Sequence, residues 1–337
     1  MSEISILLSP PPATLITKTL NPRRRLSIPT IIKPAARRSS LPTPKRTSPS
    51  LTSSLLYALH TLLLFTYSDL KNILIPQTLL ALSLTLSASP SLTLATRLPQ
   101  TLLWVWSHLL LFNLSNQRQP SSLTEDRLNK PWRPLPSDRL SLSSARNLFI
   151  ATTIACVALS SLVGGVGASV ALQGLYILNN DLHLGDTGAV TRNVLNAAGY
   201  TAFAIGGISV LDHGEGMGAQ GWQYLVLIAA VIVTTGQCQD LEDIEGDMAK
   251  GRRTVPIVWG ETAGRWSVAL PVGVWSVLAP RFWGNVGLGG VLVFALGGVV
   301  MKRLMSPPEK GGRYKTTFRL WNCWIVALYL LPMFARR

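Results

Sequence analysis

The densest cluster of acidic side chains in this sequence lies between Asp240 and Asp247. The chain has 16 acidic residues in 337 positions, and five of them fall in this short stretch. Asp240, Asp243 and Asp247 are spaced i, i+3, i+7, so a helix would place them on one face. Neighbouring carboxylates repel one another unless cations lie among them. The spacing therefore predicts a site for divalent cations.

Basic residues follow this acidic stretch directly. An apolar run, 224–235, precedes it, and Lys250, Arg252 and Arg253 come after it. Carboxylates bind Mg²⁺, and basic side chains bind phosphate oxygens, so together they suit a diphosphate that is carried with Mg²⁺. The alternative is a solvated helix end that is capped by charges, which would leave the clustering of acids unexplained.

A second polar constellation lies between residues 112 and 139. Asn113, Asn116 and Gln117 would share a helical face where an apolar run ends. After a Pro/Ser break come further charged and amide side chains: Glu125, Asp126, Asn129, Lys130 and Arg133. The alternative is an ordinary loop with capping and turn residues. Two acid clusters, each with its own Lys or Arg, favour a shared function.

Together, the two clusters predict a chemistry in which they bracket Mg²⁺ ions that bridge to a diphosphate. An allylic diphosphate held in this way would lose pyrophosphate and leave a carbocation, which needs a dry pocket with aromatic faces. The candidate walls are Trp104, Trp106, Phe112, Tyr176, Tyr200 and Phe203. Each of these rings could instead face lipid or pack in the core.

The composition indicates a polytopic α-helical membrane protein. Apolar residues make up 47% of the chain and charged residues only 14%, against roughly 25% in soluble proteins. Apolar runs of membrane-spanning length recur from about residue 73. The net charge of +15 then indicates basic loops beside anionic lipid rather than a nucleic-acid partner.

The apolar runs predict nine spans in an all-α transmembrane bundle. They cover about 74–93, 98–115, 144–162, 163–179, 193–211, 220–238, 264–280, 283–301 and 317–335. The even-numbered connections carry most of the Lys and Arg, while the odd-numbered ones carry only Arg97 and Arg281. This alternation predicts that the even connections, and with them both acid clusters, face the cytosol. The segment 55–67 is too short to span and predicts a short extra helix at the interface or against the bundle.

The first fifty residues have a different composition. They hold nine Pro, nine Lys or Arg and one acid, which cannot build a core and predicts a disordered basic tail. A transit peptide is the alternative. The predicted domains are therefore a tail, 1–50, and a membrane domain, 51–337.

These motifs resemble the UbiA superfamily of intramembrane prenyltransferases. The second acidic motif, D-x-x-D-x-x-x-D from Asp240 to Asp247 followed by K-G-R at 250–252, is a close match. The first motif departs from the usual N-D-x-x-D-x-x-x-D, because Gln117 stands where the family has Asp, although R-P-L at 133–135 matches. The stretches S-D-L-K at 68–71 and R-N-x-x-N-A at 192–197 are similar to a fungal branch that includes membrane terpene cyclases.

The resemblance implies a nine-helix bundle with a central cavity, Mg²⁺ dependence and a polyprenyl diphosphate substrate. It implies that the catalytic and metal-binding residues are Asp240, Asp243, Asp247, Glu125 and Asp126, with Asn116 as a further metal ligand. It implies that the substrate-binding residues are Asn116, Gln117, Asn129, Lys130, Arg133, Lys250 and Arg252.

Three functions follow as hypotheses. The first is a membrane terpene cyclase that ionises a farnesyl or geranylgeranyl type of diphosphate and lets the chain's own double bond capture the cation. The second is a prenyltransferase of the same fold, in which an aromatic or other acceptor captures the cation. The third is a non-catalytic transporter or scaffold, which would need charged residues within the spans. The endoplasmic reticulum is the expected membrane, with the mitochondrial inner membrane as the alternative.

Overall fold

A computed structural model describes residues 51–88, 93–213, 216–284, 286–306 and 313–335. The predicted disordered tail, 1–50, lies outside these residues. Throughout the described part, every regular element is a helix, as the sequence predicted. The longer helices are α1 (Leu51–Thr66), α2 (Ile75–Ala88), α3 (Thr93–Gln117), α5 (Leu142–Val163), α6 (Val166–Tyr176), α8 (Ala189–Leu211), α9 (Ala219–Thr235), α12 (Glu261–Trp283), α13 (Gly287–Met305) and α14 (Arg313–Phe334).

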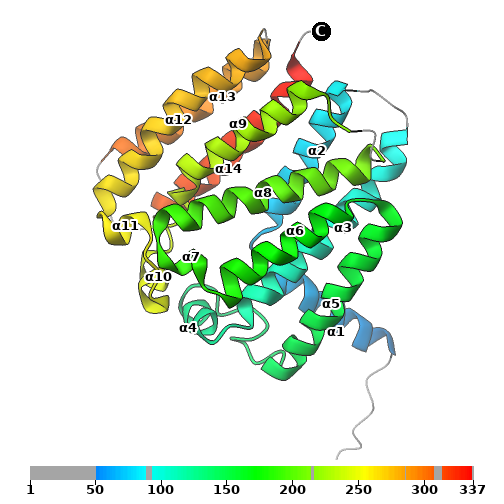
Figure 1. The fold of residues 1–337 in the computed structure, drawn as a ribbon. Helices are drawn as coiled ribbons and strands as arrows, with labels where there is room; N and C mark the ends of the chain where they lie inside the picture. Colours follow the sequence, from blue (N-terminus) through cyan, green and yellow to red (C-terminus); the bar gives the residue numbers. More distant parts are fainter. Residues whose placement is uncertain (1–50, 89–92, 214–215, 285, 307–312, 336–337) are drawn as a thin grey trace, which may run out of the picture. The chain divides into compact units, whose positions relative to one another are not determined.

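Short helices lie between these long ones and border the site described below. They are α4 (Pro120–Asn129), α7 (Leu184–Thr187), α10 (Ile244–Lys250), α11 (Val255–Val258), the π-helices η1 (Leu70–Leu74) and η2 (Ile177–Asp181), and the 3₁₀-helix η3 (Gly236–Cys238). Figure 1 shows α4, α7, α10 and α11 at the same end of the long helices. The connections that carry the two acid clusters therefore meet at one end of the bundle.

Six segments of the described residues are long and apolar enough to cross a membrane. They are Leu70–Ala88, Leu142–Val163, Ala189–Leu211, Ala219–Cys238, Gly287–Met305 and Tyr314–Phe334. These segments make the chain a multi-pass membrane protein with a helical bundle, as predicted. Each of the nine predicted ranges overlaps a helix of the described part. The number of helices that cross the bilayer stays a prediction, because α6, for example, has only 11 residues.

The predicted extra helix is present as α1, and it packs against α3 of the bundle. The Phe65 side chain is fully buried. The Trp106 indole donates a hydrogen bond to the Thr66 hydroxyl at 3.3 Å. Exposed Leu55, Leu56 and other leucines on α1 leave an apolar surface that suits the interfacial position expected for this segment.

The acidic stretch does not form one continuous helix, so the expectation that its three aspartates share a helical face is wrong. Helix α9 ends at Thr235, η3 follows, turns cover 239–242, and α10 begins after Asp243. A single face would hold three like charges close together. The break instead lets Asp240 and Asp247 turn to different arginines.

Candidate active site

A polar cavity of about 110 Å³ lies where the two acidic motifs meet. From the first motif and the preceding end of α3, its walls include Asn113, Asn116, Glu125, Lys130 and Arg133. From the second motif they include Gln239, Asp243 and Arg252. Residues of both motifs therefore line one common space.

Helix α4 positions the acids of the first motif. Pro120 stands in its first turn, where its missing N–H costs no hydrogen bond. Glu125 and Asp126 are both buried on this helix. The Asp126 carboxylate accepts a hydrogen bond from Arg133 at 2.7 Å, while its other oxygen, Oδ2, has no hydrogen-bond partner. Asp126 lies behind the cavity wall, and Arg133 lines the cavity itself.

The acids of the second motif are divided between a turn and α10. Asp240 accepts a hydrogen bond from Arg192 Nε at 3.1 Å. Asp243 lines the cavity just before α10 begins. Asp247 is fully buried on α10; its Oδ1 accepts from Arg252 Nη1 at 2.7 Å and its Oδ2 has no hydrogen-bond partner. Gly251, with φ 81°, ends α10 and turns the chain toward Arg252.

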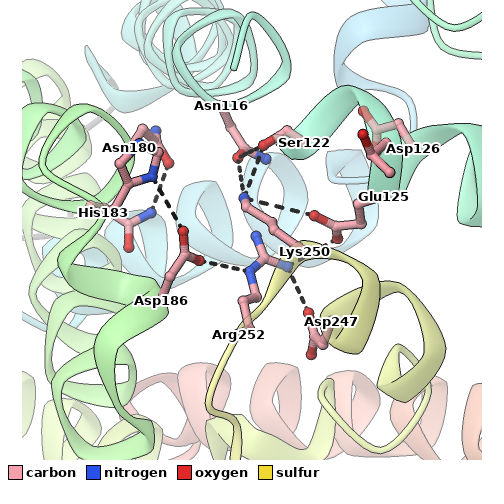
Figure 2. A network of polar contacts seen from close by, with 12 residues as sticks. Asn116, Ser122, Glu125, Asp126, Asn180, His183, Asp186, Asp247, Lys250 and Arg252 are labelled. Carbon is pink, nitrogen blue, oxygen red and sulfur yellow. Dashed lines mark hydrogen bonds and ion pairs between the residues drawn. The ribbon is translucent and has the colours of Figure 1, made fainter. Parts of the chain in front are cut away.

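Arg252 and Lys250 join the two motifs, as Figure 2 shows. Arg252 Nη1 lies 2.9 Å from Glu125 Oε1, in addition to its bond to Asp247. Lys250 Nζ donates to the Ser122 hydroxyl at 2.9 Å and lies 3.7 Å from Glu125 Oε2. Basic side chains thus lie between the carboxylates of the two motifs, which offsets their mutual repulsion.

Three of the predicted substrate-binding residues do not line the cavity. Lys250 lies beside it, at the contacts described above, and Gln117 and Asn129 pack elsewhere. Gln117 donates to the Phe65 carbonyl at 3.0 Å and to Asn113 at 2.9 Å, so it ties α3 to α1. Asn129 packs against α10, where a Cβ on Gly246 would lie 2.0 Å from its Nδ2. The positions of these two side chains indicate packing between helices.

The electrostatics of the site follow from burial and charge. Burial raises the pKa of Asp247 to about 6, although Arg192 and Arg252 lower it. Burial also raises the pKa of Asp240, against the effect of Arg192. Burial, together with the positive charge of Arg252, lowers the pKa of Lys250 to about 8.

The pKa of Glu125 shifts in the opposite direction to the pKa values of Asp240 and Asp247. Burial alone would raise the pKa of its carboxyl, but Arg252 and Lys250 more than offset this effect, so the pKa lies below its ordinary value. Glu125 is therefore an ionised acid in the cavity wall at neutral pH.

An apolar chamber of about 50 Å³ adjoins the polar cavity. The two spaces share five lining residues: Ile73, Phe112, Asn179, Asn196 and Tyr200. Tyr176 and Phe203 also line the chamber, and the rings of Phe112 and Tyr176 lie 5.4 Å apart. Four of the six predicted aromatic walls therefore surround this chamber.

The other two predicted aromatic walls pack elsewhere, so their expected role is wrong. Trp104 is fully buried, donates to the Ser160 hydroxyl at 2.8 Å, and lies so close to Gly206 that a Cβ there would be 1.9 Å from its ring. Trp106 bonds to Thr66 on α1. Both rings fill helix interfaces.

Several cavity residues were not predicted as site residues from the sequence. They include Asp69, Asn72, Asn179, Arg192 and Asn196. Two of these, Asn72 and Asn179, lie in the π-helices η1 and η2, a feature that often marks functional sites but that residue spacing does not reveal. Asp69 and Arg192 lie in the stretches 68–71 and 192–197, which resemble the family. This resemblance was the only feature of the sequence that pointed to them as site residues.

The described residues contain no group of three or more His, Cys, Asp or Glu side chains close enough to hold a metal ion together. The carboxylate oxygens Asp126 Oδ2 and Asp247 Oδ2 are buried without hydrogen-bond partners. Mg²⁺ is commonly bound by one or two carboxylates together with substrate phosphates. The residues present therefore fit an ion that arrives with a diphosphate.

Comparison with known proteins agrees with this geometry. Residues 74–323 match the model of the UbiA prenyltransferase family. The fumagillin beta-trans-bergamotene synthase af520 of Aspergillus fumigatus is 27% identical, over 82% of this chain and 93% of its own. The somaliensene A/B synthase of Streptomyces somaliensis is 28% identical, over 83% of this chain and 94% of its own.

A solved structure shows the same fold. A UbiA homolog from Archaeoglobus fulgidus, bound to GPP and Mg²⁺, superposes with a TM-score of 0.59 at 14% identity, over 81% of this chain and 99% of its own. The family model covers well over half of the sequence. The chain therefore belongs to the UbiA prenyltransferase family.

Proposed function

We propose that this protein is a Mg²⁺-dependent membrane terpene cyclase that ionises a polyprenyl diphosphate of the farnesyl or geranylgeranyl type. One observation carries the proposal: the polar cavity, with carboxylates and cations from both motifs, shares five lining residues with an apolar chamber that is ringed by aromatic side chains. The polar lining of the first space suits a diphosphate head, and the apolar lining of the second suits a hydrocarbon chain.

The polar cavity supplies the charges that a diphosphate needs. Lys130, Arg133 and Arg252 line it, and Lys250 lies beside it. In this proposal their donors bind the phosphate oxygens and stabilise the negative charge that builds up on the leaving group. Because Arg133, Lys250 and Arg252 are held in place by ion pairs, they need little reorganisation when the charge develops.

In the proposal the carboxylates of both motifs hold Mg²⁺. Asp126 and Asp247 each have a buried oxygen without a hydrogen-bond partner, and Glu125 and Asp243 line the cavity. Bound Mg²⁺ would neutralise diphosphate charge and so make pyrophosphate a better leaving group.

The reaction itself is an ionisation followed by ring closure. The bond between C1 and the diphosphate oxygen breaks, and its electron pair leaves with pyrophosphate. A double bond of the same prenyl chain then attacks the cation, and loss of a proton from a neighbouring carbon gives a cyclic alkene. The faces of Phe112, Tyr176, Tyr200 and Phe203 would stabilise the cation in a pocket with little water.

The names of two relatives support cyclisation over transfer, since both are synthases of terpenes. The test is to incubate the purified protein in lipid vesicles with Mg²⁺ and farnesyl or geranylgeranyl diphosphate, without an acceptor. We expect pyrophosphate together with a terpene hydrocarbon or alcohol. Product formation only after an aromatic acceptor is added would show a prenyltransferase instead.

The proposal places the protein in the endoplasmic reticulum, with the mitochondrial inner membrane as the alternative. The support is the membrane-spanning bundle and the basic composition of residues 1–50. Fractionation of cells that express the full chain would distinguish the two membranes.

A further inference from the structure

The connection between α6 and α8, residues 177–188, touches both acidic motifs. On the side of the first motif, Asp181 Oδ1 accepts hydrogen bonds from Arg118 at 2.5 Å and from Gln119 at 2.9 Å. Arg118 and Gln119 join α3 to α4. Asn180 donates to the Ser115 hydroxyl at 3.1 Å. This connection therefore fixes the segment from which α4 starts.

On the side of the second motif, Asp186 forms hydrogen bonds with Arg252 and with the residue that follows it. Asp186 Oδ1 accepts a hydrogen bond from Arg252 Nε at 3.0 Å. The Asp186 backbone carbonyl accepts from the Arg253 N–H at 3.2 Å. Figure 2 shows the Asp186 carboxylate on the other side of the guanidinium from Asp247. The side chain and the backbone of Asp186 thus make separate contacts with this segment.

The guanidinium of Arg252 uses two different nitrogens for these partners. Nη1 donates to Glu125 and Asp247, whereas Nε donates to Asp186. A guanidinium is planar and rigid, so fixing Nε also fixes the direction of the Nη groups. Arg252 lines the polar cavity, and Asp186 does not. Asp186 therefore contacts the cavity wall through Arg252.

We propose that Asp186 is a positioning residue that orients Arg252 toward the diphosphate. The inference rests on the proposed function, in which Glu125 and Asp247 bind Mg²⁺. Once those two carboxylates are engaged, Asp186 is the remaining acid among the ion-pair partners of Arg252 in the described part of the chain. Its bond to Nε keeps the Nη edge directed into the cavity.

The local fold rests on more than the Asp186 carboxylate, whose other contact within this connection is with His183 Nδ1 at 3.3 Å. The short helix α7 is held by close packing, since a Cβ on Gly185 would lie 2.0 Å from Asn179 Oδ1. The backbone bond between Arg253 and Asp186 is independent of the side chain. Replacing Asp186 by Asn keeps the size of the side chain, so this variant is expected to fold.

The test is a double-mutant cycle with Asp186→Asn and Arg252→Lys. Pyrophosphate release is measured in vesicles with Mg²⁺ and farnesyl or geranylgeranyl diphosphate, and kcat and KM are determined separately. We expect Asp186→Asn to lower kcat/KM about fivefold, because a charge-assisted hydrogen bond becomes a neutral one. In the Arg252→Lys background the same change should have little further effect, because lysine has no Nε–H to orient.

The control is Asp138→Asn, an exposed acid outside the cavity, which should leave kcat and KM unchanged. An equal fivefold loss in both backgrounds would show that Asp186 acts on the fold and would overturn the inference. A wild-type protein that releases no pyrophosphate would instead refute the proposed function, and the inference would fall with it. If the wild type is active but the effects of Asp186→Asn and Arg252→Lys are additive, the positioning role is refuted and the proposed function stands.

Discussion

Arg252 Nη1 lies 2.9 Å from Glu125 Oε1, although the two residues are 127 positions apart in the chain. This contact links the acidic motif that follows α3 to the one that follows α9. Both side chains are buried, with exposures of 9% and 7%, so the pair is only weakly screened by solvent. The contact therefore makes one polar site from two segments that the sequence separates.

Replacing Asp243 tests the acid at the centre of the second motif. Asp243 lines the cavity, so Asp243→Asn removes a negative charge from the proposed metal site. We expect pyrophosphate release to fall by about 100-fold or more, by analogy with the loss of a charge-stabilising group. The measurement is kcat under saturating Mg²⁺. Glu245→Gln, an exposed acid on α10, is the matched control, and equal activity of the two variants would exclude this role.

The pH dependence of kcat/KM should be bell-shaped. Asp247, whose pKa burial raises to about 6, loses its negative charge as the pH falls below that value, so binding of Mg²⁺ should weaken. Lys250, whose pKa burial lowers to about 8, loses its positive charge as the pH rises above that value, so binding of diphosphate should weaken. Activity is therefore highest between these limits.

A single variant tests the upper limb of this profile. Lys250→Arg keeps a positive charge at all accessible pH values, so the fall in kcat/KM above pH 8 should disappear while the lower limb stays. If the upper limb is unchanged in Lys250→Arg, another group is responsible for it.

The apolar chamber can be shortened at Gly199. This residue lines the chamber, and a Cβ there would meet no atom within 4 Å, so the backbone of Gly199 has room for a side chain, and Gly199→Leu should reduce the volume of the chamber. We expect kcat/KM for geranylgeranyl diphosphate to fall about tenfold or more, with a smaller loss for a shorter prenyl chain. Product analysis with both substrates measures this shift.

Gly174→Leu is the matched control for the chamber. Gly174 also has open space around a Cβ, but it lines an outer groove between α6, α8 and α9 rather than the chamber. Its substitution should leave the chain-length preference unchanged. An equal change in both variants would show that the shift does not come from the volume of the chamber.

The sequence predicted the bundle well because long apolar runs leave few alternatives in a membrane. Each expected span overlaps a helix, and 55–67 forms α1 beside α3. The break within the acidic stretch was not predictable from spacing, since it depends on arginines that come from distant segments. Arg192, which pairs with Asp240, is an example.

The site was predictable where residue type alone decides the chemistry, and not where side-chain direction decides it. Glu125, Asp243 and Arg252 line the cavity as the motifs indicated. Gln117 shares a helix with Asn116 but turns to the Phe65 carbonyl, a direction set by α1. Asp186 is a single acid without a motif, so only the structure reveals its contact with Arg252.

The most direct test of a single site built from both motifs is the binding of inorganic pyrophosphate to the purified protein in Mg²⁺ buffer, measured by isothermal titration calorimetry. Wild type, Glu125→Gln and Asp247→Asn are compared, after thermal unfolding has shown that each variant is folded. We expect one Mg²⁺-dependent binding event, weakened at least about tenfold by either substitution, because each removes a charge that faces the same ligand. Binding that only one of the two substitutions weakens, or that does not require Mg²⁺, would contradict the account.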